Sequence, residues 1–366
     1  MSIPCLDLKK QYASIKEEVL QKTEEVFDST AFSGGKYVET FEQEFAQFCE
    51  SAFALGCNNG TTALHLAMLA LGIGPGDEVI LPANTFIATA WGPSYVNATP
   101  VFVDCDPATW QIDANLVEQK ITTKTKAIIG VHLYGQPCDV DALKDIAARH
   151  QLYFIEDAAQ AQGARYKGKR IGQFGDIACF SFYPGKNLGA YGEAGGLTTQ
   201  NESYLKHMQS LRNHGMVQRY YHDEIGYNYR MDGLQGAILS IKLAKLDQWN
   251  QRRQTIAKRY QTEINNPLIT CQTQPEWAES VYHLFVVTTE NRDQLMSFLQ
   301  AHDIFPGLHY PVPCHLQKAY AYLGHQEGDF PHSEYLSKHC LSLPMFAELT
   351  DDEVTRVIEV LNAYSN

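Results

Sequence analysis

A lysine that follows a strongly apolar segment is the most reactive candidate in this sequence. Lys186 comes after the run Ile177–Phe182 and a Pro184-Gly185 turn, in surroundings poor in charge. Removing a lysine side chain from water lowers its pKa and makes the neutral amine available. A neutral amine is the nucleophile that forms a Schiff base with a carbonyl compound. The alternative is a solvated surface lysine, and this segment alone leaves both interpretations open.

A carboxylate ends a second apolar segment. The run Tyr153–Ile155 leads directly into Glu156 and Asp157. A carboxylate at the end of a strand can keep a ring nitrogen protonated, bind a metal ion or contact a ribose. It can also cap a following helix, and taken by itself this segment favours the cap.

A turn of small polar residues could bind a phosphate. Asn58–Thr62 lies between a predicted strand and the apolar helix Ala63–Leu71. The start of a helix presents backbone N–H groups and the positive end of its dipole, which together attract anions. Ser181, before the lysine turn, could add a hydroxyl. The alternative is an ordinary helix cap formed by Thr61 or Thr62.

A fourth loop, Gly226–Asp232, is both polar and aromatic, which is typical of a binding loop. The alternative is a packed surface loop with Asp232 near the start of the next helix. Together the four motifs are more informative than any one of them. A phosphate site, a carboxylate and a desolvated lysine are what pyridoxal 5'-phosphate (PLP) requires, since the carboxylate keeps its ring nitrogen protonated and the ring then accepts electrons.

The surrounding elements are expected to bring these motifs to one edge of a sheet. Strands alternate with helical patterns at 62–71, 87–96 and 140–150, which predicts a largely parallel α/β sheet. Ligands of such sheets bind beyond the carboxyl ends of the strands. Seven strands are predicted, at Ala52–Gly56, Glu78–Leu81, Pro100–Val103, Lys126–His132, Leu152–Glu156, Ile177–Phe182 and Gly196–Thr199.

The pattern changes after residue 234. A long helix is predicted from Leu234 towards Tyr260, followed by an apolar segment at Tyr282–Val287 and a Pro-rich loop. A last helix is predicted over 351–364, with Thr350 and Glu353 as a capping box. We expect a large domain over 13–245 and a smaller α/β domain over 246–366, on which residues 1–12 are candidates to pack.

Bulk properties exclude several classes of function. The formal net charge of -13 argues against a nucleic-acid partner. The N-terminus lacks the pattern of a signal peptide, and no segment reaches the ~18 apolar residues of a membrane span. The nine cysteines are scattered without zinc-ligand spacing. These features predict a cytoplasmic protein with reduced thiols and without a metal site.

The motifs resemble the sugar aminotransferases of the DegT/DnrJ/EryC1/StrS family, which have PLP fold type I, the fold of aspartate aminotransferase. The resemblance covers nearly the whole chain. Its motifs are Asp7-Leu8, Phe32–Gly35, Asn59–Thr61, Pro82–Phe86, Val131–Gly135, Glu156–Gln160, Ser181–Lys186 and Asn228–Met231.

The resemblance implies a role for each matched residue. Lys186 is similar to the Schiff-base lysine and proton shuttle, and Asp157 to the partner of the pyridine nitrogen. Gln160 resembles the residue beside the 3-hydroxyl, and Phe86 the aromatic side chain that stacks on the ring. The remaining matches concern the phosphate: they are Gly60, Thr61, Ser181 and, in the site of a neighbouring subunit, Asn228. The family therefore also implies a homodimer with shared active sites.

One departure from the commonest family pattern concerns the substrate. Members that act on carbon 4 of the sugar usually have Ser-Phe-His-x-x-Lys, whereas this chain has Tyr183 at the His position. This is similar to the subgroup that aminates carbon 3 of dTDP-linked 3-keto-6-deoxyhexoses. The segments 220–222 and 309–311 also resemble that subgroup, so Tyr183, His309 and Tyr310 are candidates for substrate contacts. Aromatic packing and turn structure are their alternative roles.

The resemblance implies a ping-pong reaction in which L-glutamate aminates the cofactor to pyridoxamine 5'-phosphate, which then aminates a nucleotide-linked keto sugar. Three other functions stay open. A related dehydratase branch carries His in place of the lysine, so Lys186 argues against it. A PLP-fold regulator would not need so complete a site, and a plain nucleotide-sugar binding protein would need neither Lys186 nor Asp157.

Overall fold

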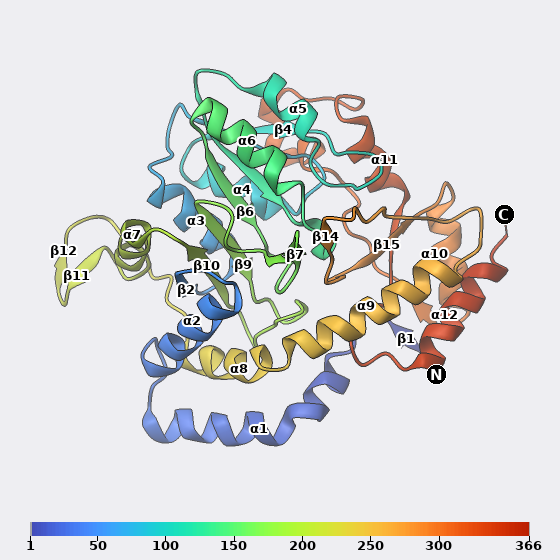
Figure 1. The fold of residues 1–366 in the computed structure, drawn as a ribbon, viewed down its shortest axis with the longest axis horizontal. Helices are drawn as coiled ribbons and strands as arrows, with labels where there is room; N and C mark the ends of the chain where they lie inside the picture. Colours follow the sequence, from blue (N-terminus) through green and yellow to red (C-terminus); the bar gives the residue numbers. More distant parts are fainter. Residues whose placement is uncertain (1, 366) are drawn as a thin grey trace.

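A seven-stranded sheet forms the centre of the protein in a computed structural model that describes residues 2–365 (Figure 1). Its spatial order is β2-β10-β9-β6-β5-β3-β4, and only β10 runs against the others. The seven predicted strands and the mostly parallel α/β sheet are confirmed. The strands are β2 (Phe53–Cys57), β3 (Glu78–Pro82), β4 (Thr99–Val103), β5 (Thr125–Val131), β6 (Tyr153–Asp157), β9 (Ile177–Ser181) and β10 (Gly195–Thr199).

Helices cover both faces of this sheet, as its continuously apolar strands require. Successive side chains of a strand point to opposite faces. Val79 and Leu81 accordingly join one buried cluster, and Ile80 joins the other. One face carries α3 (Gly60–Ala70), α4 (Ile87–Tyr95) and α7 (Glu202–Arg212), and the other carries α2 (Lys36–Phe48), α6 (Val140–His150) and α8 (Gly233–Leu243).

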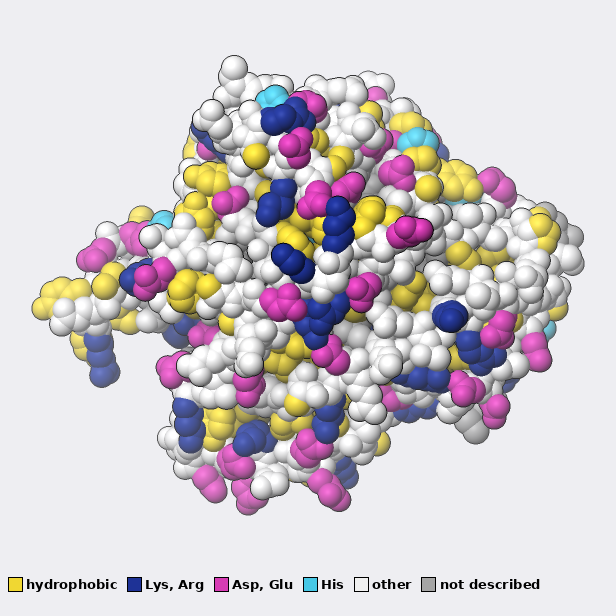
Figure 2. Space-filling view, viewed as in Figure 1, with side chains coloured by type: hydrophobic (Ala, Val, Ile, Leu, Met, Phe, Trp, Pro, Cys, Tyr) yellow, Lys and Arg dark blue, Asp and Glu magenta, His cyan; other side chains and the backbone are white. Residues whose placement is uncertain are grey.

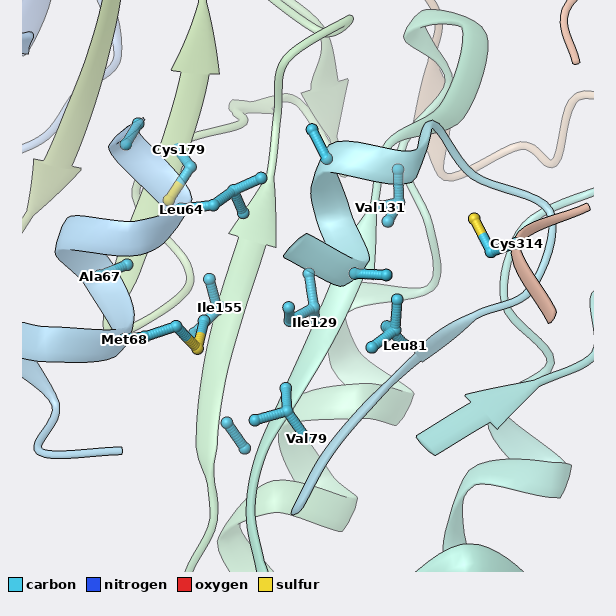
Figure 3. Close-up of a cluster of buried hydrophobic side chains, with 14 of the residues drawn as sticks. Leu64, Ala67, Met68, Val79, Leu81, Ile129, Val131, Ile155, Cys179 and Cys314 are labelled. Atoms are coloured by element: carbon cyan, nitrogen blue, oxygen red, sulfur yellow. The ribbon is translucent and has the colours of Figure 1, made fainter. Parts of the chain in front are cut away.

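Apolar packing between α3 and the strands fixes the helix against the sheet. In Figure 3, Leu64 and Met68 of α3 lie with Ile129 and Ile155 of the strands in one buried cluster. Each of these side chains is at most 2% exposed. Burying a side chain of this size stabilises the fold by about 1.5–3 kcal/mol. The start of α3 is therefore held rigidly at the carboxyl end of the sheet.

The single long helix predicted from Leu234 to Tyr260 is wrong. The chain forms α8 and then a separate helix α9 (Leu246–Glu263), with a break at Ala244-Lys245. No Gly or Pro marks this break, and apolar residues continue across it. Tertiary packing causes it, because α8 packs between α2 and the N-terminal helix α1 (Leu8–Ser29), whereas α9 continues towards the C-terminal helix.

A second hydrophobic core lies in the C-terminal part of the chain. It is built around the strands β13 (Thr270–Cys271), β15 (Phe285–Thr288) and β17 (Cys340–Leu343) with α9, α10 (Arg292–Ala301) and α12 (Asp351–Ala363). The predicted capping box of Thr350 and Glu353 is present at the start of α12. The N-terminal β1 (Ile3–Pro4) pairs with β16 (Ile304–Phe305) beside this core. We propose that this core marks the smaller unit, beginning at α9 and including the first residues.

The remaining elements are short and lie around these two cores. They are α5 (Ala114–Val117), α11 (Pro331–His339), the hairpin β11 (Met216–Gln218) and β12 (Tyr221–His222), and the small sheet of β7 (Arg165–Tyr166), β8 (Lys169–Arg170) and β14 (Ala278–Glu279). None of the helices within residues 2–365 has the length and apolar character to cross a membrane. All nine cysteines fall in this range and are free thiols.

Candidate active site

A cavity of about 620 Å³ opens beyond the carboxyl ends of the central strands. It gathers every residue singled out from the sequence except Asn228. These residues come from distant parts of the chain and represent three of the four motifs, whereas no residue of the loop Gly226–Asp232 lines the cavity. They are Gly60, Thr61, Phe86, Asp157, Gln160, Ser181, Tyr183, Lys186, His309 and Tyr310.

Lys186 enters the cavity from the turn that follows β9. Its backbone N–H donates to the Tyr183 carbonyl at 2.8 Å, which closes the turn. Burial lowers the pKa of Lys186 to about 8, and the negative charge of Asp157 only partly opposes this effect. Near neutral pH an appreciable fraction of Lys186 is therefore the uncharged amine, the form that can act as a nucleophile or a base.

Asp157 occupies the end of β6 inside the same cavity. One carboxylate oxygen accepts from the Thr89 hydroxyl at 2.7 Å, and the other accepts from the Ala159 N–H at 3.2 Å. A turn follows β6, so the role of helix cap is wrong. Burial raises the pKa of Asp157 above its ordinary value, although the hydrogen bond from Thr89 lowers it in part. A buried carboxylate of this kind is stabilised by a cation beside it, such as a protonated ring nitrogen.

Glu156 points to the opposite face of the sheet and has a structural role. It lies 3.1 Å from the His132 ring and accepts backbone N–H groups of Gly172, Phe174 and Gly175. Burial by itself would raise the pKa of Glu156, but these hydrogen bonds lower it below the ordinary value. Of the two adjacent carboxylates, only Asp157 is therefore directed at the cavity.

The first turn of α3 presents unpaired backbone donors to the cavity. Asn59 is the N-cap, because its side-chain oxygen accepts from the Thr62 N–H at 2.8 Å. The alternative in which Thr61 or Thr62 is the cap is wrong. Of the backbone N–H groups in this turn, the Asn59 side chain accepts only that of Thr62. The N–H groups of Gly60 and Thr61 therefore have no acceptor among residues 2–365. These donors and the helix dipole fit an anion.

The end of β9 comes close to the start of α3, and the two together form a small recess in the cavity. A Cβ atom at Gly60 would lie 2.7 Å from Cβ of Ser181, closer than such atoms normally come. The absence of a side chain at Gly60 thus allows the Ser181 hydroxyl to lie beside the free N–H groups. Together with Lys186 and Asp157, this recess fits the phosphate, aldehyde and ring nitrogen of PLP.

An aromatic ring and an amide from the segments after β3 and β6 also line the cavity. The Phe86 ring is 49% exposed within the cavity lining and lies 5.4 Å from the ring of Tyr310. Gln160 donates to the Tyr310 hydroxyl at 2.9 Å and accepts from the Tyr134 N–H at 2.6 Å. Phe86 is therefore free to stack on a planar ligand, whereas Gln160 connects the sheet to the segment that carries Tyr310.

The segment 307–310 closes the cavity from the smaller core. The His309 ring lies 2.8 Å from the Ser342 hydroxyl, and the His309 carbonyl accepts from the Tyr134 hydroxyl at 2.7 Å. Burial and the nearby charge of Lys186 lower the pKa of His309 to about 4, so its ring is neutral near pH 7. Tyr183, on the lysine turn, is 55% exposed and available to a ligand.

Several residues in or beside the cavity were missed in the sequence. Thr89 fixes Asp157 through a helix position that looked like ordinary packing, and its hydroxyl also lies 2.8 Å from that of Thr85. His283 lies at the start of the segment predicted as apolar, where a single histidine gave no signal of its own. Cys5 and Leu6 line the cavity from the N-terminus, and no local motif marks them.

Asn228 does not line the cavity of its own chain. It is exposed on the loop that follows the β11–β12 hairpin, where it bridges to Asn213. Exposed apolar side chains surround this region, at Val217, Tyr220, Tyr221 and Ile225. The tip of this projection is visibly apolar at the left of Figure 2. Within residues 2–365, no group of three or more His, Cys, Asp or Glu side chains could hold a metal ion.

Comparison with known proteins agrees with this geometry. The chain is 46% identical over 364 residues to the erythromycin biosynthesis sensory transduction protein EryC1 of Saccharopolyspora erythraea, covering 99% of this chain and 100% of that protein. It is 44% identical to a dTDP-3-amino-3,6-dideoxy-alpha-D-galactopyranose transaminase of Aneurinibacillus thermoaerophilus, with 99% of each chain covered.

The solved structures agree as well. The crystal structure of DesV from S. venezuelae superposes with a TM-score of 0.97 at 44% identity, covering 99% of this chain and 98% of that one. Residues 13–362 match the sequence pattern of the DegT/DnrJ/EryC1/StrS aminotransferase family. The chain therefore belongs to the DegT/DnrJ/EryC1/StrS aminotransferase family.

Proposed function

We propose that this protein is a PLP-dependent aminotransferase that transfers an amino group from L-glutamate to carbon 3 of a dTDP-linked 3-keto-6-deoxyhexose. One observation carries the proposal: a lysine of lowered pKa, a buried carboxylate and a helix start with free N–H groups face one cavity. No single one of these features identifies a cofactor. Their combination matches the aldehyde, the ring nitrogen and the phosphate of PLP, and one protein of similar fold has been solved in both a PLP form and a PMP form.

Each proposed cofactor contact uses a side chain or backbone N–H group that lines the cavity. The N–H groups of Gly60 and Thr61 and the Ser181 hydroxyl would hold the phosphate. Asp157, oriented by Thr89, would keep the ring nitrogen protonated, and Phe86 would stack on the ring. Gln160 would lie beside the 3-hydroxyl. When bound, PLP would supply an electron sink and carry the amino group from one substrate to the other.

Lys186 moves the protons in this scheme. As a neutral amine, its Nζ would take the proton from the α-carbon of L-glutamate and return it to the cofactor carbon two bonds away, a 1,3-shift that one base can carry out. The same lysine serves the second half-reaction in the reverse direction.

The choice of carbon 3 rests on Tyr183 and on the names of relatives. Tyr183 stands where carbon-4 enzymes of the family usually have His, and its side chain is free to meet the sugar. A 44% identical relative is named a dTDP-3-amino-sugar transaminase. His309 and Tyr310 lie on the opposite wall, where they contact the sugar or its diphosphate.

The active form is proposed to be a cytoplasmic homodimer. A single chain leaves Asn228 outside its own cavity and exposes the apolar residues of the β11–β12 projection. Patches of this kind are covered in oligomers, and two-fold dimers are the commonest form. In the dimer, Asn228 reaches the phosphate of the neighbouring site.

A second candidate is a regulatory protein, because the relative EryC1 carries a sensory transduction name. Incubation with 15N-labelled L-glutamate and either a dTDP-3-keto or a dTDP-4-keto 6-deoxyhexose distinguishes these functions. We expect 15N in the sugar product of the 3-keto substrate, at carbon 3. Label only in the 4-keto product would move the reaction to carbon 4, and label in neither would favour the regulator.

A further inference from the structure

Two buried threonine hydroxyls lie behind the carboxylate of Asp157. The Thr89 hydroxyl donates to Oδ2 of Asp157 at 2.7 Å, and the Thr85 hydroxyl lies 2.8 Å from the Thr89 hydroxyl. The three side chains belong to residues that are only 3% (Thr85), 1% (Thr89) and 5% (Asp157) exposed. They therefore form one buried chain of hydrogen bonds that ends at the carboxylate proposed to face the ring nitrogen of the cofactor.

The direction of this chain is fixed when Asp157 is ionised. A carboxylate carries no hydrogen, so the Thr89 hydroxyl must be the donor in that contact. A hydroxyl has a single hydrogen, and that of Thr89 is thereby used. Thr85 must consequently donate to the Thr89 oxygen, and the donors run from Thr85 through Thr89 to Asp157.

Protonation of Asp157 would disturb this arrangement. A hydrogen on Oδ2 would compete with the hydrogen that Thr89 donates, and reversing both hydroxyls would leave the Thr85 hydrogen without an acceptor among residues 2–365. Oδ1 already accepts the Ala159 N–H at 3.2 Å. Burial is the largest influence on the pKa of Asp157 and raises it, whereas the hydrogen bond from Thr89 lowers it. The two hydroxyls therefore favour the ionised form.

The backbone around Thr85 is held in place by a distant segment. The Cys314 N–H donates to the Ala83 carbonyl at 2.9 Å, and the Cys314 thiol lies 3.2 Å from the Thr85 carbonyl, which accepts from it. Phe86 is the N-cap of α4, so Thr89 lies in the first turn of that helix. Both hydroxyls are therefore carried by backbone that is fixed in the fold, and their separation does not depend on a ligand.

We propose that Thr85 is a positioning residue that acts through Thr89: its hydroxyl directs the Thr89 hydrogen to Asp157 and so keeps that carboxylate ionised in its buried site. The inference rests on the proposed function and deepens it, because an ionised Asp157 is what a protonated ring nitrogen requires. Thr85 directly precedes Phe86, the side chain proposed to stack on the ring. One short segment would thus serve both the face of the ring and its nitrogen.

Removing each hydroxyl while keeping the shape of the side chain tests this relay. Thr89→Val and Thr85→Val replace the hydroxyl by a methyl group, and Thr89→Ser keeps the hydroxyl as the conservative control. The measurement is the pH titration of the Asp157 carboxyl in full-length protein without cofactor, followed by 13C NMR of labelled aspartate. The signal that disappears in Asp157→Asn identifies the carboxyl of Asp157.

We expect the titration midpoint to rise by about one pH unit in Thr89→Val, which loses a hydrogen bond to a charged group, and to stay in place in Thr89→Ser. It should rise by about 0.3 pH unit in Thr85→Val, where the remaining bond is only weakened. Thr85→Val should add nothing once Thr89 is Val, since its effect passes through Thr89. An unmoved midpoint in Thr85→Val, or an equal further rise in the double variant, would overturn the proposal. Melting temperatures check folding, and Thr85→Val decides alone if Thr89→Val does not fold.

A second readout uses protein to which PLP has been added. The rate at which saturating L-glutamate fades the yellow band should fall about tenfold in Thr89→Val and about twofold in Thr85→Val, with half-saturation unchanged. A purely structural role would lower the melting temperatures and leave this rate and the titration midpoint in place, which contradicts the inference. If the midpoints move as expected but the unsubstituted protein binds no PLP, the relay stands and the proposed function has failed.

Discussion

The two walls of the active-site cavity are built in different ways. The wall on the sheet comes from strand ends and one helix start, and its groups are held by hydrogen bonds within the large core, as Asp157 is held by Thr89. The opposite wall comes from the smaller core, where His309 lies against Ser342. The first wall carries the groups for the cofactor together with Tyr183, and the second carries His309 and Tyr310, the other candidates for the substrate.

This difference separates chemistry from specificity. Groups for the chemistry lie in short motifs that a parallel sheet must bring together, whatever the substrate. Apart from Tyr183 on the lysine turn, the candidate groups for specificity lie on the connecting segment 307–310. Substitutions on the first wall should therefore damage both half-reactions, and substitutions on the second should damage only the sugar half.

Loss of the lysine is the strongest test of the sheet wall. Lys186→Ala should reduce turnover by at least about a thousandfold, because both proton transfers lose their base. The variant should still bind PLP without a covalent bond. Steady-state rates and the absorbance spectrum check both points.

An exposed lysine serves as the matched control. Lys124 lies on a surface turn outside the cavity, so Lys124→Ala should keep the full rate. Substantial turnover in Lys186→Ala would remove this residue from the mechanism.

The carboxylate at the end of β6 should have the next largest effect. Asp157→Asn keeps the shape and the contact with Thr89 but cannot stabilise a protonated ring nitrogen, so both half-reactions should slow about a hundredfold. Single-turnover rates with L-glutamate and with the sugar measure the two halves separately.

The neighbouring carboxylate sharpens this test. Glu156→Gln should lower the melting temperature, because Glu156 accepts several buried hydrogen bonds on the other face of the sheet. Its folded fraction should keep the bound cofactor and the rate. A Glu156 variant that loses activity as severely as the Asp157 variant would contradict the division of roles.

The pKa of Lys186 predicts that PLP capture is about tenfold slower at pH 7 than well above pH 8. The amine is charged below about pH 8 and neutral above it, so capture of PLP by cofactor-free protein should fall as the pH falls through 8. At pH 7 only about a tenth of the amine is neutral. The rate of appearance of the aldehyde-bound absorbance band measures this, and a rate that is flat from pH 6 to 9 would be inconsistent with it.

The smallest effect is expected on the opposite wall. Tyr310→Phe removes one hydrogen bond, to Gln160, and a hydroxyl that can meet the sugar, so KM for the sugar should rise several-fold. The glutamate half-reaction should be unchanged, and His309→Asn should behave in the same way. Equal losses in both half-reactions would indicate that these residues support the structure instead.

Local signals explain which parts could be predicted from the sequence. The strands were visible as apolar runs, and Lys186 and Asp157 were visible because they end such runs. The break at Ala244-Lys245 was not, since packing and not a local residue causes it. Asn59 was overlooked as the cap because the threonines that follow it can also cap a helix, although Asn is the better N-cap. His283 depends on a contact with Asn187 96 residues away, which no local pattern encodes.

The absorbance spectrum of the purified protein, before and after L-glutamate, tests the central claim most directly. We predict a yellow band that fades with L-glutamate and returns on addition of a dTDP-3-keto-6-deoxyhexose. A band that fades but does not return would agree with an aminotransferase and would contradict the proposed sugar substrate. Absence of any band, even after PLP is added, would contradict the role of Lys186 and Asp157 as the centre of the site.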